Sequence, residues 1–202
     1  MTTRVLIVED QGMMRDALAA LLDLEDDLEV VAQVGSAEEA VPTATRVRPD
    51  VVLLDIELPG GSGLDVTGDL RAALPGCAVI IVTTFGRPGY LRRALDAGAR
   101  GFVVKDRPVD ELAQAVRRVL AGETVVDPAL AAAALSAGPS PLTPREREVL
   151  IAAADGSTAA DISGRLHLSE STVRNHLSSC IMKTGTRNRM EAVRVARHSG
   201  WL

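Results

Sequence analysis

Five side chains that could bind a metal ion and react with phosphorus each follow a short apolar run of the sequence. The acidic ones are Glu9, Asp10 and Asp55, and the others are Thr83 and Lys105. Three carboxylates held close together repel one another unless a cation intervenes, and Mg2+ prefers carboxylate, backbone and water oxygens. A carboxylate beside such an ion can attack phosphorus, because the metal, an ammonium and a hydroxyl together neutralise the transferred group. These residue types therefore favour formation of an aspartyl phosphate.

The hydrophobic pattern of the first part of the chain provides a way to bring these residues together. Apolar runs too short for helices alternate with segments of helical periodicity. This alternation predicts an α/β fold with a doubly wound, five-stranded parallel sheet, for which we take the flavodoxin-like strand order 2-1-3-4-5. In that order the first and third strands are neighbours and all carboxyl ends lie along one edge. The runs are Val5–Val8, Leu28–Val34, Val51–Leu54, Ala78–Val82 and Phe102–Val104.

Helix-end residues support these elements. Ser36 lies three residues before Glu39, which is the spacing of a capping box. Pro88 suits the first turn of a helix, and Gly98 and Gly122 suit positions just after helix C-termini.

The four charged residues also have an ordinary structural interpretation. A single Asp at a strand end is usually a turn or cap residue, and a single Lys there is usually solvated. An acidic pair such as Glu9 and Asp10 can simply begin a helix, whose dipole favours negative charge. The convergence of four strand ends that carry complementary charges favours the functional interpretation.

Composition limits the class of protein. The chain has 202 residues, 47% hydrophobic and 24% charged, which suits a globular protein of one or two domains; only 2% are aromatic, so the core must be aliphatic. Cys77 and Cys180 have no CxxC spacing, which argues against a disulfide framework or metal knuckle and predicts two buried thiols. No signal peptide or membrane-spanning run is recognisable, so we expect a cytoplasmic protein without a membrane partner.

Charge divides the chain into two parts. Residues 1–138 contain 13 Lys and Arg against 21 Asp and Glu, whereas residues 139–202 contain nine against six. Between them, Val125 to Pro141 is rich in Ala and then in Gly, Pro and Ser, which predicts a short helix and a flexible joint. The expected organisation is a first domain over 1–122, a linker over 123–140 and a basic second domain over 141–202.

The second domain has a helical pattern. Thr143, Pro144 and Glu146 predict a capped helix that continues through Ala154. Further helices are expected over Thr158–Leu166, Glu170–Lys183 and Met190–His198. In the helix from Glu170, the buried stripe is Val173, Leu177 and Ile181, which turns Arg174, Asn175 and Ser178 outward, with His176 beside them. Two short helices joined by a tight turn indicate a helix-turn-helix, although an ordinary helical hairpin would show the same pattern.

The first part resembles the receiver domain of bacterial two-component response regulators. The matching motifs are ED after the first strand, LLDIELPGGSGLD around the third, VTT at the end of the fourth and GFVVKD around the lysine. The resemblance implies that Asp55 accepts the phosphoryl group. It also implies Mg2+ ligands from Glu9, Asp10 and Asp55 and from the backbone carbonyl of Glu57.

The same resemblance assigns the residues that respond to phosphorylation. Thr83 would be the hydroxyl that moves toward the phosphoryl group, Lys105 would pair with it, and Phe102 would be the switch aromatic residue. Many receivers have proline directly after this lysine, often with a cis bond, whereas Asp106 follows here. Whether the Lys105–Asp106 bond is cis therefore stays open at this point.

The tail resembles the DNA-binding domain of the NarL/FixJ (LuxR-type) regulators through LTPREREVL, LSESTVRNHLSS and TRNRMEAV. The residues expected to face bases are Arg174, Asn175 and Ser178. Those expected to touch phosphates, or to fix the helix beside them, are Thr172, Arg187, Asn188 and Arg189. Two departures from the family pattern are the segment 157–161 and Thr184, which stands where leucine is common.

Both resemblances imply a transcriptional regulator that is not an enzyme. A sensor histidine kinase would phosphorylate Asp55, and the protein would dimerise on double-stranded promoter DNA. One alternative is a haloacid-dehalogenase-type phosphohydrolase, which would need a second aspartate where Glu57 stands. The other is an atypical regulator that binds DNA without phosphorylation.

Overall fold

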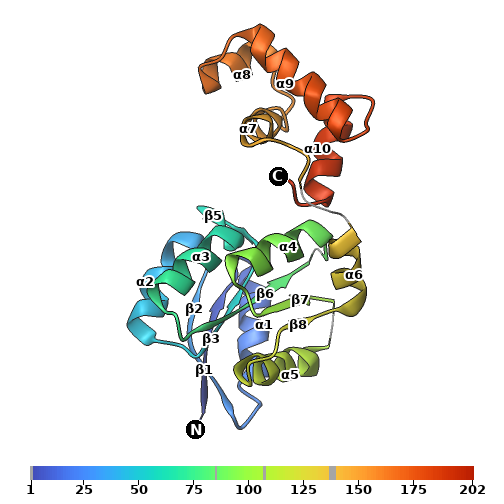
Figure 1. The fold of residues 1–202 in the computed structure, drawn as a ribbon. Coiled ribbons are helices and arrows are strands. Elements are labelled where there is room, and N and C mark those ends of the chain that lie inside the picture. Colours follow the sequence, from blue (N-terminus) through green and yellow to red (C-terminus); the bar gives the residue numbers. More distant parts are fainter. Residues whose placement is uncertain (1, 85, 107, 137–139) are drawn as a thin grey trace. The chain divides into compact units, whose positions relative to one another are not determined.

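The computed structural model describes residues 2–84, 86–106, 108–136 and 140–202, shown in Figure 1. They form two compact units, the first built largely from residues up to Ala131 and the second from Ala132–Leu202. Within these described residues, no helix is both long enough and apolar enough to cross a lipid bilayer.

A parallel sheet forms the centre of the first unit. Its order, β2-β1-β3-β6-β7-β8, contains the expected arrangement of the five main strands, with β1 between β2 and β3. The doubly wound α/β fold is thus confirmed. The strands are β1 (Thr3–Val8), β2 (Leu28–Val34), β3 (Val51–Leu54), β6 (Ala78–Thr83), β7 (Gly101–Val104) and β8 (Val125–Val126).

Helices cover both faces of this sheet (Figure 1). One face carries α1 and α5, which contact each other, and the other carries α2, α3 and α4. Successive strand residues alternate between the faces. Val5 and Ile7 of β1 pack in the cluster formed with α1 and α5, and Leu6 and Val8, which alternate with them along the strand, are equally buried. The helices are α1 (Gly12–Leu22), α2 (Ala37–Val47), α3 (Gly63–Ala73), α4 (Pro88–Ala97) and α5 (Val109–Leu120).

The expected linker adds a strand that the sequence pattern did not predict. Val125 and Val126 form β8 and pair in parallel with Gly101 and Phe102 of β7. A two-residue strand has too short an apolar run to be recognised, and its place at the sheet edge comes from pairing alone. The expected short helix follows as α6 (Pro128–Ser136). Residues 137–139, part of the expected flexible joint, lie outside the described residues.

Two local expectations were wrong. Ser36 is the N-cap residue of α2, but its side chain accepts no hydrogen bond from the helix backbone; its hydroxyl instead donates to the Glu39 carboxylate at 3.0 Å. Cys77 is only partly buried, because it lies in the turn before β6 rather than in the strand, whereas Cys180 is fully buried. Gly98 and Gly122 have the positive φ angles, 98° and 93°, that suit the ends of helices.

The second unit is helical around a core of its own. Thr143 and Thr158 each form a capping box at the start of α7 and α8, and the helix expected through Ala154 ends at Ala152. The last helix begins at Arg189, one residue earlier than expected. The helices are α7 (Pro144–Ala152), α8 (Ala159–Leu166), α9 (Glu170–Lys183) and α10 (Arg189–His198).

A tight turn follows β3 and leads into α3. It contains a short antiparallel hairpin of β4 (Glu57–Leu58) and β5 (Gly61–Ser62), after which the amide of Gly63 donates to the Ile56 carbonyl at 2.9 Å. A Cβ atom on Gly63 would lie 1.9 Å from the backbone oxygen of Asp55. Only glycine allows α3 to begin this close to the end of β3.

Gly63→Ala should therefore lower the free energy of unfolding by about 1–3 kcal/mol or more, since the added methyl displaces the backbone at Asp55. The matched control is Gly68→Ala in the same helix, where a Cβ has no atom within 4 Å; it should raise stability by about 0.4–1 kcal/mol. Urea unfolding followed by circular dichroism measures both. Equal effects of the two substitutions would contradict the close approach.

Candidate phosphoacceptor site and nucleic-acid interface

The ends of β1 and β3 bring the acidic residues of the first unit together. Val8 pairs with Leu54 in the parallel register, so Glu9 and Asp55 leave adjacent strands side by side. One carboxylate oxygen from each of Glu9, Asp10 and Asp55 lies within 4.8 Å of the others. This set of hard oxygen donors could hold a divalent cation.

Lys105 forms an ion pair with each of the two buried carboxylates. Its ammonium nitrogen lies 2.5 Å from Glu9 Oε2 and 2.6 Å from Asp55 Oδ2, and the three side chains are only 2–6% exposed. The other oxygen of Asp55 accepts a hydrogen bond from the amide of Ile56 at 2.6 Å. Asp55 is therefore held in one orientation at the end of β3, with its carboxylate next to a fixed positive charge.

Burial and charge act against each other in this site. Burial raises the pKa of Glu9, and the opposing hydrogen bond from Lys105 does not cancel that effect. Burial alone would lower the pKa of Lys105, but hydrogen bonds to Asp55 and Glu9 outweigh it, so that pKa is raised. The raised pKa of Lys105 reflects two carboxylates that share one ammonium. Such an excess of negative charge in a buried place is the condition that attracts a further cation.

Of the remaining expected residues of this site, Thr83 and Phe102 lie on β6 and β7, and Glu57 lies on β4. Thr83 at the end of β6 is 1% exposed, and its backbone carbonyl accepts a hydrogen bond from the Lys105 amide at 2.8 Å. Phe102 on β7 is buried. The Lys105–Asp106 peptide bond is trans. Glu57, at the start of β4, has an exposed side chain.

One residue near this site was missed by sequence reasoning. Arg15 of α1 donates a hydrogen bond from its guanidinium to the backbone carbonyl of Glu9 at 2.7 Å and packs over Gly35. It thereby links the loop after β1 to the loop after β2. An arginine six residues after an acidic one has no distinctive spacing, so the sequence held no signal for this contact.

In the second unit, α8 and α9 form the expected helix-turn-helix. His167 adopts a left-handed conformation (φ 52°) at the turn, and Ser169 caps α9 by accepting from the Thr172 amide. Val173 and Leu177 are buried, and Ile181 packs against the same core. The opposite side of the helix exposes the expected base-facing residues Arg174, Asn175 and Ser178. Arg174 forms an ion pair with Glu170, one turn earlier.

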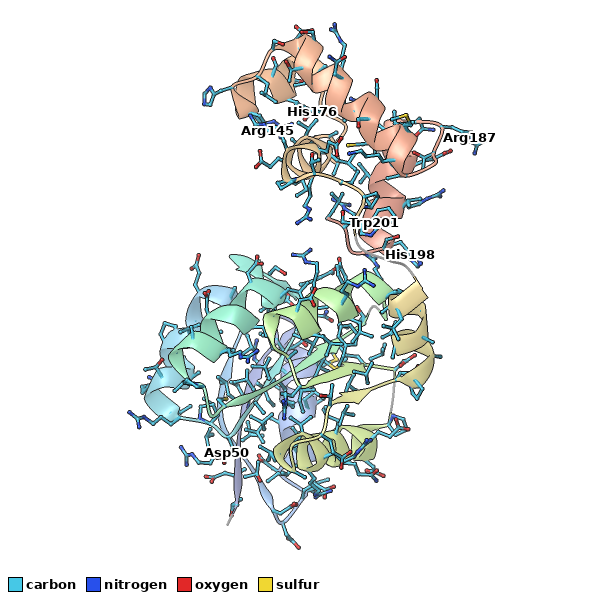
Figure 2. The ribbon with its side chains drawn as sticks, viewed as in Figure 1. Asp50, Arg145, His176, Arg187, His198 and Trp201 are labelled. Carbon is cyan, nitrogen blue, oxygen red and sulfur yellow. The ribbon has the colours of Figure 1, made fainter. Side chains whose placement is uncertain are left out.

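The expected phosphate-contacting residues differ in their surroundings. Arg187 is 88% exposed and projects outward before α10, as Figure 2 shows, with an ion pair to Glu191 at 3.0 Å. Asn188 caps α10 by accepting from the Glu191 amide at 2.9 Å. Arg189 donates to the carbonyls of Ser157 and Gly156 at 2.7 and 3.1 Å. The side chains of Asn188 and Arg189 are thus hydrogen-bonded to backbone groups of α10 and of the loop before α8.

Two further side chains lie close to α9. The Thr172 hydroxyl is 2.8 Å from that of Ser169, within the N-terminal turn of the helix. Thr184, which stands where leucine is common in the family pattern, is the C-cap residue of α9. Its hydroxyl donates to the Cys180 carbonyl at 2.8 Å.

A buried carboxylate in this unit was also missed. Glu146, expected only as a capping residue of α7, is 5% exposed and bonded to Lys183 and Ser179 of α9. Burial acts to raise its pKa, but hydrogen bonds from Lys183, Ser179 and Thr143 outweigh it and lower the pKa to about 2. The capping-box spacing signalled the contact with Thr143 but not the contact with α9.

Comparison with known proteins identifies the two units. Residues 5–117 match the response regulator receiver domain, and residues 140–196 match the bacterial regulatory proteins of the luxR family. The chain belongs to the LuxR-type family of response regulators. A receiver domain joined to a LuxR-type DNA-binding domain makes it a transcriptional regulator of the two-component kind.

Relatives match over almost the whole chain. Identity is 42% over 197 residues to the transcriptional regulatory protein DesR of Bacillus subtilis, covering 98% of each chain. It is 45% over 201 residues to the uncharacterized transcriptional regulatory protein YvfU of the same organism, covering 98% of this chain and 99% of that one.

Solved structures resemble the chain as well. The response regulator ChrA of a heme-sensing two-component system is 32% identical, with a TM-score of 0.58 over 100% of this chain and 99% of that one. The response regulator RcsB, in a complex with DNA, is 22% identical with a TM-score of 0.69 over 98% of this chain and 99% of that one, and shares the fold.

Lys105→Met should destabilise the first unit by roughly 3–5 kcal/mol, because it leaves Glu9 and Asp55 buried without their cation. Arg117→Met is the matched control, since its ion pairs with Glu25 and Asp27 are solvent-exposed and such pairs contribute about 0–1 kcal/mol. Urea unfolding at neutral pH in the presence of a metal chelator measures the two losses. Similar losses would show that the ammonium of Lys105 is not needed to hold the buried carboxylates.

Proposed function

We propose that this protein is a phosphorylation-controlled transcription factor whose phosphoacceptor is Asp55. The observation that carries the proposal is the gathering of Glu9, Asp10 and Lys105 around that carboxylate at the end of β3. Such an arrangement supplies an oriented nucleophile, donors for a cation and a positive charge for the transferred group.

The first unit would take its phosphoryl group from the phosphohistidine of a sensor histidine kinase. A carboxylate oxygen of Asp55 forms a bond to phosphorus while the bond between phosphorus and the kinase imidazole nitrogen breaks. Lys105, now 2.6 Å from Asp55 Oδ2, would neutralise an oxygen of the phosphoryl group, and Thr83 would donate its hydroxyl to another. Thr83 ends β6, the strand next to β3, and Lys105 follows β7, the next strand along, so both lie at the same edge of the sheet as Asp55.

Mg2+ is the cation that suits this donor set. Glu9, Asp10 and Asp55 would hold it, together with the backbone carbonyl of Glu57 and water molecules. When bound, it would polarise the phosphoryl oxygens and offset the charge of the carboxylates.

Phosphorylation would change the surface around β6 and β7. The acyl phosphate adds about one unit of negative charge and three acceptor oxygens to a buried site, by analogy with other phosphorylated residues. Thr83 would be drawn toward these oxygens, and Phe102 would respond on the adjacent strand. Shifting a two-state element from 1:99 to 99:1 requires about 5.5 kcal/mol of differential interaction, which charged hydrogen bonds in a buried site can supply.

The output would be dimerisation on promoter DNA. One helix-turn-helix reads only a few base pairs, so a symmetric pair reading half-sites about 10 bp apart explains how a specific site is reached. We assign the receiver interface to α1 and α5, and pairing on DNA to α10. We place the protein in the cytoplasm, because both of its proposed partners, the phosphohistidine of a sensor kinase and promoter DNA, would be encountered inside the cell.

On DNA, α9 would enter the major groove. Arg174 can pair with guanine and Asn175 with adenine, and the exposure of both supports that assignment, together with Ser178. The remaining expected contacts divide by their surroundings. Arg187 is free to reach a phosphate once it leaves Glu191, whereas Asn188 and Arg189 would act mainly by holding α10 and the loop before α8. Thr172 would contact the backbone near the start of α9.

We propose the domain limits 1–122 for the receiver, 123–140 for the linker and 141–202 for the DNA-binding domain. The pairing of Val125 and Val126 with β7 supports a linker that begins docked on the receiver. A phosphohydrolase is the weaker alternative, because Glu57 stands where that chemistry requires a second aspartate and its side chain is exposed.

Asp55→Asn should abolish labelling of the protein by acetyl phosphate, because the amide cannot form the acyl phosphate. Intact-mass spectrometry after incubation with acetyl phosphate and Mg2+ measures the mass of one added phosphoryl group. Asp65→Asn, which changes an exposed aspartate of α3, is the control and should label like the wild type. Undiminished labelling of the Asp55 variant would remove the assignment.

Arg174→Ala should weaken binding to a selected DNA site by about 1–3 kcal/mol, since one base contact is lost. Arg187→Ala should weaken binding to all duplexes alike and reduce the slope of log affinity against log salt by about one. Fluorescence anisotropy over a range of salt concentrations measures both effects. If Arg174→Ala bound the selected site as tightly as the wild type, the opposite face of α9 would have to be considered.

A further inference from the structure

The carboxylate of Glu146 is fully engaged with groups from two helices. Its Oε1 accepts from the Ser179 hydroxyl at 2.6 Å and from Lys183 Nζ at 2.9 Å. Its Oε2 accepts from the same Lys183 Nζ at 2.7 Å and from the Thr143 amide at 2.7 Å. A single buried acid of α7 is therefore bonded both to the cap of its own helix and to α9.

The two partners on α9 fix that helix in a specific way. Ser179 and Lys183 are four residues apart, so they lie on one face, one turn above the other. Two directional bonds from one face to a fixed carboxylate set both the rotation of α9 about its axis and its position along that axis. The other contacts of α9 with α7 include a weak hydrogen bond from the Cys180 thiol to the Glu146 carbonyl at 3.6 Å. They also include packing of apolar residues such as Val173 and Leu177, which has no such directional demand.

Rotation and position are the quantities on which base reading depends. Arg174, Asn175 and Ser178 leave α9 on the side away from the core, and Ser178 directly precedes Ser179. Recognition side chains have to be held within about 0.5 Å and 10–20° of a productive geometry. A change in the rotation of α9 would move all three residues together.

Two simpler roles for this network make different predictions. Lys183 could be a phosphate ligand, but its side chain is 30% exposed and its ammonium is bonded to both oxygens of Glu146. The network could merely add stability, but a buried ion pair is weak support for stability, and its best-attested use is to fix register.

We propose that Glu146 is a positioning residue for DNA recognition, which orients α9 through Ser179 and Lys183 so that its exposed residues reach the base edges. The inference rests on the proposed function, in which α9 enters the major groove. Glu146 would thus contribute to sequence specificity without itself contacting DNA.

The test compares Glu146→Gln with Glu148→Gln in the full chain after treatment with acetyl phosphate and Mg2+. Both substitutions remove one negative charge from α7, but Glu148 is about half exposed and paired with Arg145 on the surface. A duplex selected by the wild type from a random library serves as the specific site, and a scrambled duplex serves as the non-specific one. Fluorescence anisotropy gives the ratio of the two affinities at 20 °C, where circular dichroism shows the folded fraction.

Glu146→Gln should lower this specificity ratio at least about tenfold, the size of one lost base contact, while non-specific binding persists. Glu148→Gln should leave the ratio unchanged. Should Glu146→Gln fail to fold, Ser179→Ala carries the test, because it removes one hydrogen bond from Oε1 and should lower the ratio in the same direction. An unchanged ratio in a folded variant of Glu146, or in Ser179→Ala when it carries the test, would overturn the proposal.

Lys183→Met separates positioning from phosphate binding. It should lower the specificity ratio and leave the salt dependence of binding unchanged, and the double variant with Glu146→Gln should be no worse than the poorer single variant, because both remove one interaction. A salt slope reduced by about one would instead make Lys183 a phosphate ligand and contradict the inference. A wild-type chain that selects no duplex would contradict the proposed function itself.

Discussion

The burial of two carboxylates against one ammonium is the interaction on which the first unit depends. Glu9 and Asp55 are almost completely buried at the ends of adjacent strands. Lys105, which follows β7 two strands away from β3, lies within 2.6 Å of both. The ammonium offsets the repulsion between two acids held side by side. The parallel register of β1 and β3 places Glu9 beside Asp55, and Gly63 lets α3 begin close to the Asp55 backbone.

A similar arrangement recurs in the second unit with a different consequence. Glu146 is buried and bonded to Lys183, but its other partners are a helix cap and a serine, and no second acid lies among them. The charge there is already balanced, so the group orients a helix rather than attracting a cation. Around Asp55, by contrast, two buried carboxylates share one ammonium, so negative charge exceeds positive charge.

The sequence predicted the parts of the structure that follow from periodic patterns. The five main strands, their order and the meeting of their carboxyl ends follow from apolar runs and from the topology of doubly wound sheets. The cap at Thr143 and the exposed face of α9 follow from helical spacing. Contacts that depend on packing between elements could not be predicted in this way. Among them are the pairing of Val125 and Val126 with β7, and the contact of Glu146 with Lys183 across 37 residues. Ser36 and Glu39 show the opposite failure, because the spacing of a capping box is present but the two side chains bond to each other instead.

The central claim is that the carboxylates around Asp55 form a site for a phosphoryl group that depends on a divalent cation. Fluorine nuclear magnetic resonance with beryllofluoride, a mimic of a phosphoryl group on a carboxylate, tests it directly. In the presence of Mg2+ the account predicts bound fluorine resonances, separate from that of free beryllofluoride, that disappear when a chelator removes the metal. Saturating beryllofluoride and Mg2+ that produce no bound resonance, or bound resonances that persist after chelation, would contradict the account.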